Sequence, residues 1–283
     1  MDQKFIELFD RFTHGAMKRR EFLDKLASLA GSAAAASALL PVLENNYARA
    51  DVVAEDDRRV HSGIAQITDT VSGYLSVPEP LDKKTSAVLV IHENRGLNPH
   101  IKDVTRRLAL EGFIALAPDY LFALGGTPDD PDKARDMIGT LKPEDVLATS
   151  RTALLSIQKY PLNRGKTGAV GFCWGGGQVN ALAVADPLLA AGVAYYGLQP
   201  QAADVAKITA PLLLHYAGLD DRINAGIPDF EAALKANNKT YELYKYEGVN
   251  HAFNNDTSAE RFNKAAADLA WKRTLAFFAR TLR

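Results

Sequence analysis

The sequence predicts an α/β fold in which helices cover both faces of a mostly parallel sheet. Over roughly 200 residues, short apolar runs alternate with segments of helical periodicity, an order that demands parallel strands joined by crossover helices. Several runs, such as residues 86–91, are apolar without interruption, as in strands buried on both faces. Glycine and proline separate the runs, so the segments are well delimited.

The strands are expected to begin with a hairpin and to continue as buried parallel strands. The hairpin comprises residues 60–67 and 73–77, with a turn between them. The later strands are predicted at 86–91, 113–117, 167–172, 191–196, 211–216 and 241–246. In a sheet of this kind functional loops follow the carboxyl ends of the strands, so residues just after 91, 172, 216 and 246 are where a site is expected.

The helices are expected between these strands and at the end of the chain. They are predicted at 101–111, 143–160, 174–185, 228–236 and 259–281. Gly112 ends the first, and a loop rich in Gly, Asp and Pro is expected over 125–132. In the last helix an inward stripe is predicted from Leu269, Leu275, Phe277 and Phe278.

Composition excludes several classes of protein. The chain has 283 residues, and its 33 Lys and Arg against 34 Asp and Glu give a net charge of −1. A near-neutral chain has no global attraction for nucleic acid or for an anionic membrane. Its single cysteine excludes an intramolecular disulfide and the Cys clusters that hold zinc or iron–sulfur groups.

Residues 1–50 differ from the rest and resemble a twin-arginine export signal. The run KRREFL at 18–23 precedes an uncharged stretch, 26–43, and small residues in A-x-A form end at Ala50. The stretch is weakly apolar and contains Pro41, so stable membrane insertion is not expected. We therefore predict a boundary at residue 50, a body over 51–283, and export to the periplasm by the twin-arginine machinery.

A cytoplasmic location is the alternative. Three acidic residues precede the arginines, and apolar residues among them have the spacing of an amphipathic helix; these residues are Phe5, Leu8, Phe9 and Phe12. Residues 1–50 would then be a helical extension of a cytoplasmic protein.

The strongest motif is GFCWGGG at 171–177, between a predicted strand and a predicted helix. A G-x-nucleophile-x-G turn in that position is the nucleophile elbow of α/β-hydrolases. It would present Cys173 at the N-terminus of a helix, where free N–H groups and the helix dipole favour a thiolate. The backbone N–H of Trp174 would point toward a developing oxyanion. The alternative for Cys173 is a buried packing cysteine.

A thiol nucleophile needs a base and an acid that orients it, and in this fold they follow the nucleophile in the order acid, histidine. Asp220 follows the predicted strand 211–216, and His251 follows 241–246. We prefer Asp220 over the adjacent Asp221 because it stands two residues past Gly218 in a G-x-D pattern. The predicted triad is therefore Cys173, His251 and Asp220.

The other histidines fit this pattern poorly. His215 lies inside a predicted strand and is expected in the core, and His92 stands at a strand end where it could line the pocket. His14, His61 and His100 have no partner pattern. No H-E-x-x-H or similar spacing is present, so a metal site is not expected.

With these motifs the sequence resembles the dienelactone hydrolases, or carboxymethylenebutenolidases, over roughly residues 60–283. The resemblance rests on GFCWGG at 171–176, GLD at 218–220, GVNHAF at 248–253 and VIHENRGL at 90–97. It implies a cofactor-free α/β-hydrolase that cleaves a small lactone or ester through an acyl-thioester on the elbow cysteine. Residues 51–283 would form this domain.

Two further roles are implied by the resemblance alone. Glu93, just after the first buried strand, would take part in forming the thiolate, and the backbone N–H of Asn94 would be the second oxyanion donor. The alternative for Glu93 is an ion pair with Arg95 or Arg106.

The predicted substrate contacts depart from the family pattern. The family type holds a substrate carboxylate partly with an arginine four residues after the histidine, and here that position is Asn255. Arg95 or Arg135 is a candidate replacement, because guanidinium binds carboxylate bidentately. Phe253 is a candidate apolar contact for the substrate.

Two other functions stay open. A thiol-dependent thioesterase, or a peptidase-like hydrolase of larger acyl donors, would use the same triad. A non-catalytic module with this fold would use the pocket for ligand capture only. The absence of a second domain that could hold a polymer favours a small-molecule substrate.

Overall fold

The computed structural model describes residues 1–282 and contains one eight-stranded sheet. The strand order is β1-β2-β4-β3-β5-β6-β7-β8. The strands are β1 (Val60–Gln66), β2 (Ser72–Pro78), β3 (Thr85–Ile91), β4 (Ile114–Pro118), β5 (Asn163–Phe172), β6 (Ala191–Tyr195), β7 (Leu212–Ala217) and β8 (Tyr241–Tyr246). The β1–β2 and β2–β4 pairs are antiparallel and the other five pairs are parallel. The predicted fold class is confirmed.

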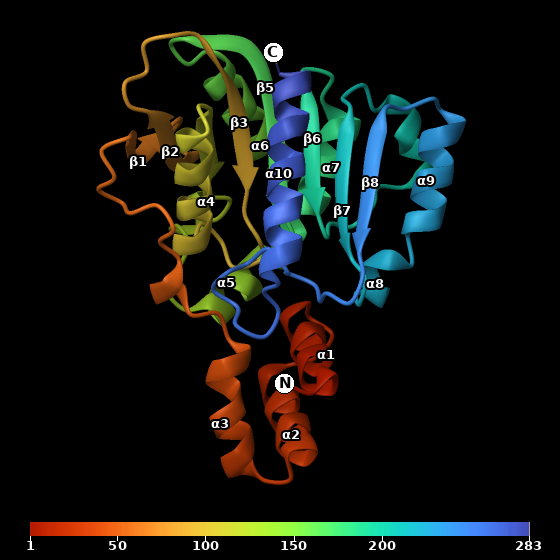
Figure 1. Cartoon of the computed structure of the whole chain (residues 1–283). Helices are drawn as coiled ribbons and strands as arrows, with labels where there is room; N and C mark the ends of the chain where they lie inside the picture. Colours follow the sequence, from red (N-terminus) through yellow and green to blue (C-terminus); the bar gives the residue numbers. More distant parts are fainter. Residues whose placement is uncertain (283) are drawn as a thin grey trace.

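Helices cover both faces of this sheet because its strands are apolar on both sides. In β3, Val88 and Val90 face one apolar cluster, whereas Leu89 and Ile91 face another. Helices α4 (Pro99–Leu110) and α10 (Lys264–Thr281) pack on the first face, and both stand in front of the sheet in Figure 1. Helices α6 (Pro143–Gln158), α7 (Trp174–Ala185) and α9 (Ile227–Ala236) pack on the second.

The short elements lie in the connections. They are α5 (Pro131–Ile138), α8 (Asp221–Asn224) and the 3-10 turns η1 (Tyr47–Arg49), η2 (Phe122–Leu124) and η3 (Ala202–Lys207). Helix α5 was not expected, because Pro131 falls inside the predicted loop 125–132. The side chain of Asp130 caps this helix by accepting hydrogen bonds from the N–H groups of Asp132 and Lys133, and Pro131 suits its first turn.

The last helix differs from the prediction in its start and in its buried face. It begins at Lys264 rather than at residue 259, because the Asn263 side chain caps it by accepting from the N–H of Ala266. Leu269 is 44% exposed, so its place in the inward stripe was wrong. The buried stripe consists of Ala266, Ala267, Ala270, Thr274, Phe277 and Phe278.

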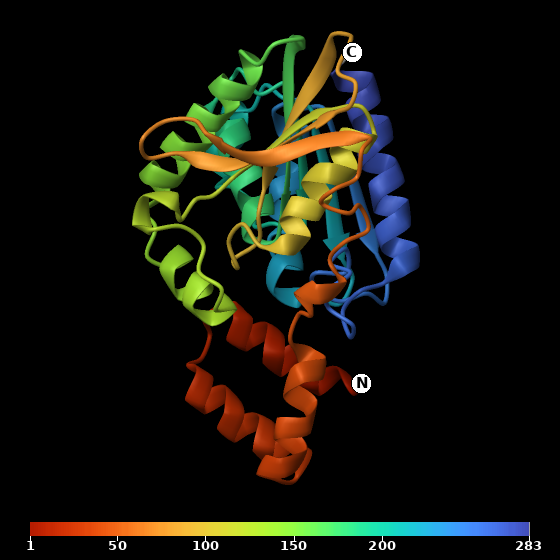
Figure 2. The ribbon, with the colours of Figure 1, turned by 90° about the vertical axis from the view of Figure 1, so that its left-hand side faces the viewer.

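The N-terminal residues fold into three helices with an apolar core of their own. These are α1 (Gln3–Thr13), α2 (Arg19–Ala30) and α3 (Ala33–Leu43). Phe12 stacks on Phe22 with ring centroids 4.5 Å apart, and Leu26 and Leu43 complete the cluster around them. Figure 2 shows the three helices protruding from the end of the body.

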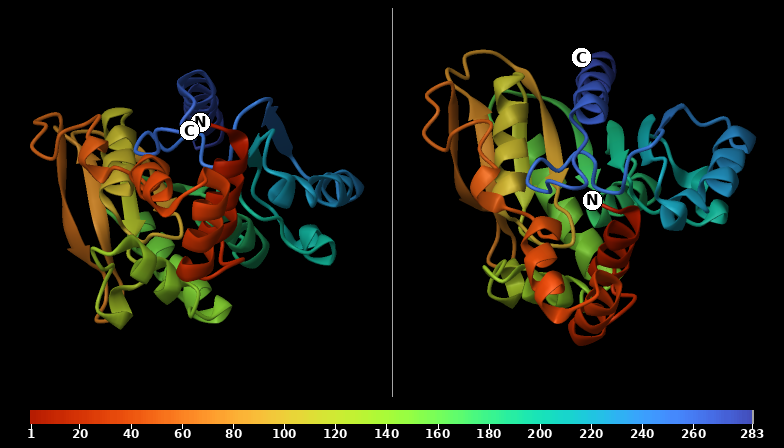
Figure 3. Two further views of the ribbon diagram at one scale, coloured as in Figure 1. Left: turned by 90° about the horizontal axis from the view of Figure 1, so that it is seen from below. Right: turned by 60° about the horizontal axis from the view of Figure 1, so that its bottom comes forward.

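This helical unit covers the edge of the sheet where the parallel strands end. In Figure 1 the arrowheads of β3, β7 and β8 point toward it, and the view from below in Figure 3 places α1 over the middle of that edge. Gln3 Nε2 donates to Asn250 Oδ1 at 2.6 Å, and Asn94 Nδ2 donates to the backbone oxygen of Thr13 at 2.7 Å. Arg19, from the twin-arginine run, forms an ion pair with Asp132.

In the described chain no single helix is long and apolar enough to cross a membrane. Helices α2 and α3 meet the length and composition criteria only as a pair, and they are bent by 112° relative to each other. Phe22 of the KRREFL run is fully buried in the N-terminal core. Whether residues 1–50 serve as an export signal stays a prediction.

Candidate active site

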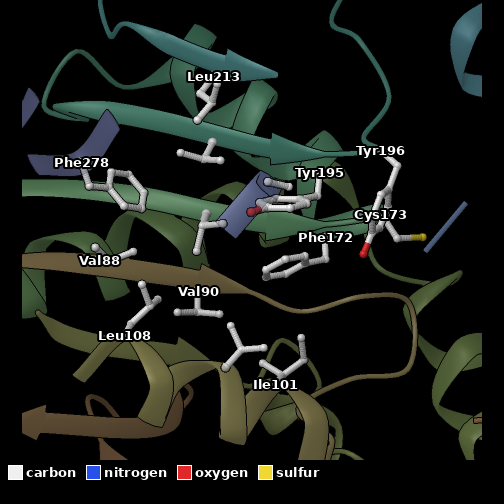
Figure 4. Packing of buried hydrophobic residues seen from close by; sticks show 14 of the residues in the cluster. Val88, Val90, Ile101, Leu108, Phe172, Cys173, Tyr195, Tyr196, Leu213 and Phe278 are labelled. Atoms are coloured by element: carbon white, nitrogen blue, oxygen red, sulfur yellow. The ribbon is translucent and has the colours of Figure 1, made fainter. Parts of the chain in front are cut away.

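The elbow between β5 and α7 holds Cys173 in a strained backbone conformation, in a tight turn that needs a glycine two positions before it and two positions after it. Cys173 has φ +56° and ψ −117°, a strained combination for a residue with a side chain. A Cβ on Gly171 would lie 2.1 Å from the backbone oxygen of Gly175, and a Cβ on Gly175 would lie 2.2 Å from that of Ile91. The two flanking glycines are therefore a steric requirement of the turn. Figure 4 shows the sulfur pointing away from Phe172 and Tyr195, out of the apolar core.

The loops after β7 and β8 bring an acid and a histidine to the same edge. Nδ1 of His251 lies 2.5 Å from Oδ2 of Asp220, and both residues are buried. Asp220 Oδ1 also accepts from the N–H of Ile223 at 3.3 Å, which fixes the carboxylate at the start of α8. The adjacent Asp221 is exposed. Nε2 of His251 has no hydrogen-bond partner among the described residues, and a ring nitrogen of this histidine lies within 4.8 Å of the Cys173 sulfur.

A second histidine, which the sequence analysis left without a partner, also reaches the sulfur. Nε2 of His14, at the end of α1, lies 3.3 Å from Sγ of Cys173. Its Nδ1 lies 2.8 Å from the backbone oxygen of Asp10 and 3.2 Å from Oδ1 of the same residue. The His14 and His251 rings meet edge to face with centroids 4.6 Å apart. The available signal was the Asp10–His14 spacing, which puts a carboxylate and an imidazole on one helix face.

The charges around the sulfur favour a thiolate. Burial alone would raise the pKa of Cys173, but the positive charges of His14 and His251 lower it to about 6. Burial opposes protonation of His251, yet Asp220 and the thiolate raise its pKa well above the usual value. The thiolate and Asp10 likewise raise the pKa of His14 against the effect of burial. These shifts favour the thiolate form of Cys173 and the protonated forms of both imidazole rings.

Glu93 is held by a neutral neighbour rather than by an arginine. It is 4% exposed, and Oε2 accepts from Asn255 Nδ2 at 2.7 Å. Oε1 has no hydrogen-bond partner among the described residues, and the carboxylate lines the cavity beside Cys173. The alternative of an ion pair with Arg95 or Arg106 was wrong: Arg95 pairs with Asp132, and Arg106 with Asp51.

The two expected oxyanion donors come from the start of α7 and from the loop after β3. Trp174 is the first residue of α7, where a backbone N–H has no partner within the helix. Its indole stacks on the buried ring of His92 at 5.4 Å and meets Tyr120 edge to face, so its position is fixed. Asn94 follows β3 and borders both cavities that contain Cys173.

Helix α1 divides the space above Cys173 into two cavities of about 570 and 670 Å³. Thr13 and His14 line both of them. The smaller cavity is rich in charge and is bordered by Arg19, Glu44, Glu93, Arg95, Asp132 and Arg261. The larger one has an apolar side formed by Ile138, Trp174, Leu198 and Ile223. Each is of the size that a small ligand occupies.

The three predicted substrate contacts have different outcomes. Arg95 lines the charged cavity, and its Nη1 lies 2.6 Å from Asp132. Arg135 lines the larger cavity, pairs with the same carboxylate at 3.1 Å and packs over the ring of Phe12. Phe253 was wrong as a substrate contact, because it is fully buried among Tyr195, Tyr196 and Tyr246.

Two of the other histidines, His215 and His100, are held by contacts within the body of the protein. His215 is buried, as expected, with ring nitrogens 3.0 Å from Tyr246 Oη and 3.2 Å from Thr274 Oγ1, and burial lowers its pKa to about 3. His100 pairs with Asp256 at 3.0 Å.

One group of side chains has the donors that zinc prefers. The ligand atoms of His14, Cys173 and His251 lie within 4.8 Å of one another. No sequence spacing predicted this group, because its members come from three distant segments. A metal held there would occupy the sulfur and the imidazole that a thiol hydrolase needs free.

Comparisons with known proteins support one family over most of the chain. A family model described as "Dienelactone hydrolase family" matches residues 71–282. A protein of Saccharolobus solfataricus named "Putative carboxymethylenebutenolidase" is 33% identical over 246 residues, which cover 74% of this chain and 94% of that protein. A shorter Escherichia coli protein, "Putative hydrolase fragment YghX", is 45% identical over 107 residues, or 36% of this chain and 92% of that one.

Solved structures agree with the sequence relatives. A crystal structure from Klebsiella pneumoniae, described as "Putative Dienelactone Hydrolase", superposes with a TM-score of 0.71 and 29% identity, over 78% of this chain and 98% of that one. A separate family model, described as "YqhI-like", matches residues 1–32, the part of the chain that contains α1 and His14.

Proposed function

Because this chain belongs to the dienelactone hydrolase family and is an ester-hydrolysing enzyme, we propose that it cleaves small lactones or esters through an acyl-thioester on Cys173. In this proposal Cys173, His251 and Asp220 form the catalytic triad. The observation that carries it is the placement of a strained, elbow-borne sulfur within 4.8 Å of a buried imidazole whose other nitrogen is held by Asp220 at 2.5 Å.

The proposed reaction has two halves. In the first, the thiolate attacks the carbonyl carbon, the ester carbon–oxygen bond breaks, and the leaving alkoxide takes the Nε2 proton of His251. In the second, water attacks the thioester, His251 takes a proton from that water, and the carbon–sulfur bond breaks to restore the thiolate. Asp220 keeps the imidazole in position through both proton transfers.

The backbone N–H groups of Trp174 and Asn94 are proposed to stabilise the oxyanion in each half. A donor of this kind contributes about 3–4 kcal/mol to catalysis in other hydrolases. Glu93, buried beside the thiol and anchored by Asn255, is proposed to assist in thiolate formation when substrate enters.

The cavities support a small substrate without a carboxylate. Arg95 and Arg135 share the carboxylate of Asp132, so an anionic substrate would compete with that carboxylate for either guanidinium. Arg261, which also lines the smaller cavity, donates to Ser258 and Asn45. The position at which the resembling family carries an arginine is filled by Asn255, which is fully buried and bound to Glu93. A neutral lactone or a short ester therefore fits this site better than a dienelactone acid.

The test compares wild type, Cys173→Ala and Cys173→Ser on p-nitrophenyl acetate, neutral lactones, a carboxylate-bearing dienelactone and acyl thioesters. We expect both variants to lose turnover while keeping the wild-type circular dichroism spectrum, and the neutral lactones and esters to be the better substrates. Undiminished hydrolysis by Cys173→Ala would remove Cys173 from the chemistry.

The same panel tests the two other functions. A strong preference for acyl thioesters would indicate a thioesterase. An acyl adduct on Cys173 that mass spectrometry detects but that never turns over would indicate a ligand-binding module.

A further inference from the structure

We propose that His14, oriented by Asp10, is a second catalytic imidazole of this enzyme, and that the N-terminal helical unit exists in part to deliver it. Its role is to donate a hydrogen bond to the Cys173 sulfur, which stabilises the thiolate both as attacking group and as leaving group. This inference rests on the proposed role of Cys173 as nucleophile.

The site is nearly symmetric about the sulfur, which faces two imidazoles with an aspartate behind each. Nδ1 of His251 lies 2.5 Å from Oδ2 of Asp220. Nδ1 of His14 lies 2.8 Å from the backbone oxygen of Asp10 and 3.2 Å from its Oδ1, which has no hydrogen-bond partner among the described residues. The His14 contact to Sγ, at 3.3 Å, is within hydrogen-bonding distance for sulfur. Because His14 touches the reacting atom, it qualifies as a catalytic residue by position.

His14 is fixed in place by contacts of its neighbours. The backbone oxygen of Thr13, its neighbour, accepts a hydrogen bond from Asn94, a residue of the proposed oxyanion hole. On either side, Arg135 packs over Phe12 at 4.5 Å and Arg261 packs over Phe9 at 5.1 Å. These three contacts hold the end of helix α1, and with it His14, against residues that line the cavities.

The charges around the sulfur are also balanced. With the thiolate, Asp10 and Asp220 carrying three negative charges, both rings can stay protonated although they lie 4.6 Å apart. Ionisable groups from other elements also lie near this cluster. They include Glu93 beside β3, Tyr196 after β6, Arg222 on α8, Arg261 before α10, and the cavity-lining residues Arg19, Glu44, Tyr47, Arg95, Asp130, Asp132, Arg135 and Asp136. A protonated His14 therefore adds a second positive charge beside the sulfur to the one that His251 supplies.

The division of labour follows from the reaction. His251 gives its proton to the alkoxide in the first half and recovers one from water in the second. Between these two steps its ring is neutral and places no positive charge beside the sulfur. His14 keeps its proton throughout and forms no covalent bond. When the carbon–sulfur bond of the thioester breaks, the electron pair returns to a sulfur that still has a charged donor beside it.

The experiment uses the full chain with His14→Gln, Asp10→Asn and the matched control His61→Gln, in which the replaced histidine is exposed on β1. For each protein we would measure the pH profile of iodoacetamide alkylation without substrate, and kcat and KM separately on the best ester. We expect His14→Gln to lower the alkylation rate at pH 6 about tenfold or more and to move the profile to higher pH, as loss of a charged hydrogen bond predicts. We expect kcat to fall while KM changes little.

Two further results complete the test. Asp10→Asn, which leaves the imidazole in place, should shift the alkylation profile in the same direction by a smaller amount. If His14→Gln does not fold, His14→Ala assayed with and without free imidazole replaces it, and rescue of kcat by imidazole is expected. A pH profile and kcat equal to those of His61→Gln, in a protein whose Cys173→Ala variant is inactive, would overturn the role of His14 alone. An active Cys173→Ala variant would overturn the proposed function instead.

Discussion

Nε2 of His14 lies 3.3 Å from the sulfur of Cys173, although 159 positions separate the two residues in the chain. The N-terminal unit that carries His14 also divides the space above Cys173 into two cavities. The end of helix α1 and the start of helix α2 are therefore part of the wall of the candidate site, through Phe9, Phe12, Thr13, His14, Gly15 and Arg19.

Replacing a flanking glycine of the elbow by alanine should lower the stability of the protein, whereas replacing the third glycine of the helix should raise it. Gly175→Ala places a Cβ 2.2 Å from the backbone oxygen of Ile91, so we expect a loss of about 1–3 kcal/mol or more in the free energy of unfolding. Gly177→Ala meets its nearest atom at 3.5 Å, inside helix α7, and should gain about 0.5–1 kcal/mol. Urea unfolding of both variants checks this, and equal stabilities would contradict the steric account.

Replacing Asp220, the carboxylate that pairs with His251, should lower kcat, whereas replacing the adjacent Asp221 should not. Asp220→Asn removes the charge that orients and stabilises the imidazolium, and we expect kcat to fall by a factor of about 10³–10⁴, as in other triads. Asp221→Asn changes an exposed residue outside the pair and should keep kcat near the wild-type value. Steady-state kinetics on one ester decides between them, and similar losses in both variants would argue against Asp220 as the acid.

Alkylation of the wild-type thiol should follow a depressed pKa. The thiol pKa is lowered from 9.0 to about 6, so the thiolate fraction is high at neutral pH and falls as pH drops below 6. Iodoacetamide should therefore modify Cys173 at pH 6 much faster than it modifies free cysteine, measured by intact mass against time. A rate profile with its midpoint near 9 would show that the two imidazoles do not act on the sulfur.

The N-terminus allows a decisive measurement on protein taken from its own host. Export with cleavage after Ala50 predicts a mature chain that starts at Asp51, without His14. The inference on His14 predicts that the active enzyme keeps residues 1–50. N-terminal sequencing and intact mass of the active fraction separate the two: a start at Met1 or Asp2 rejects cleavage, and a start at Asp51 in a fully active enzyme rejects the role of His14.

The sequence alone determined the parts of this protein that local patterns encode. Unbroken apolar runs marked each buried strand to within a few residues, and prolines and glycines marked most boundaries. The elbow glycines, and the acid and histidine at the ends of two later strands, indicated Cys173, Asp220 and His251, because parallel topology places strand ends at one edge. The capping residues Asp130 and Asn263 were the local sequence signals for helix α5 and for the start of helix α10.

Tertiary structure decided everything that depends on contacts between distant segments. It placed His14 beside Cys173, 159 positions away in the chain, and Asn255 beside Glu93. It paired Arg95 and Arg135 with Asp132. It also buried Phe253 among tyrosines. No periodicity or spacing carries such information, because the free energy of these contacts arises only when the folded chain excludes water from between them. A histidine without a neighbour in sequence can therefore still lie at the centre of the site.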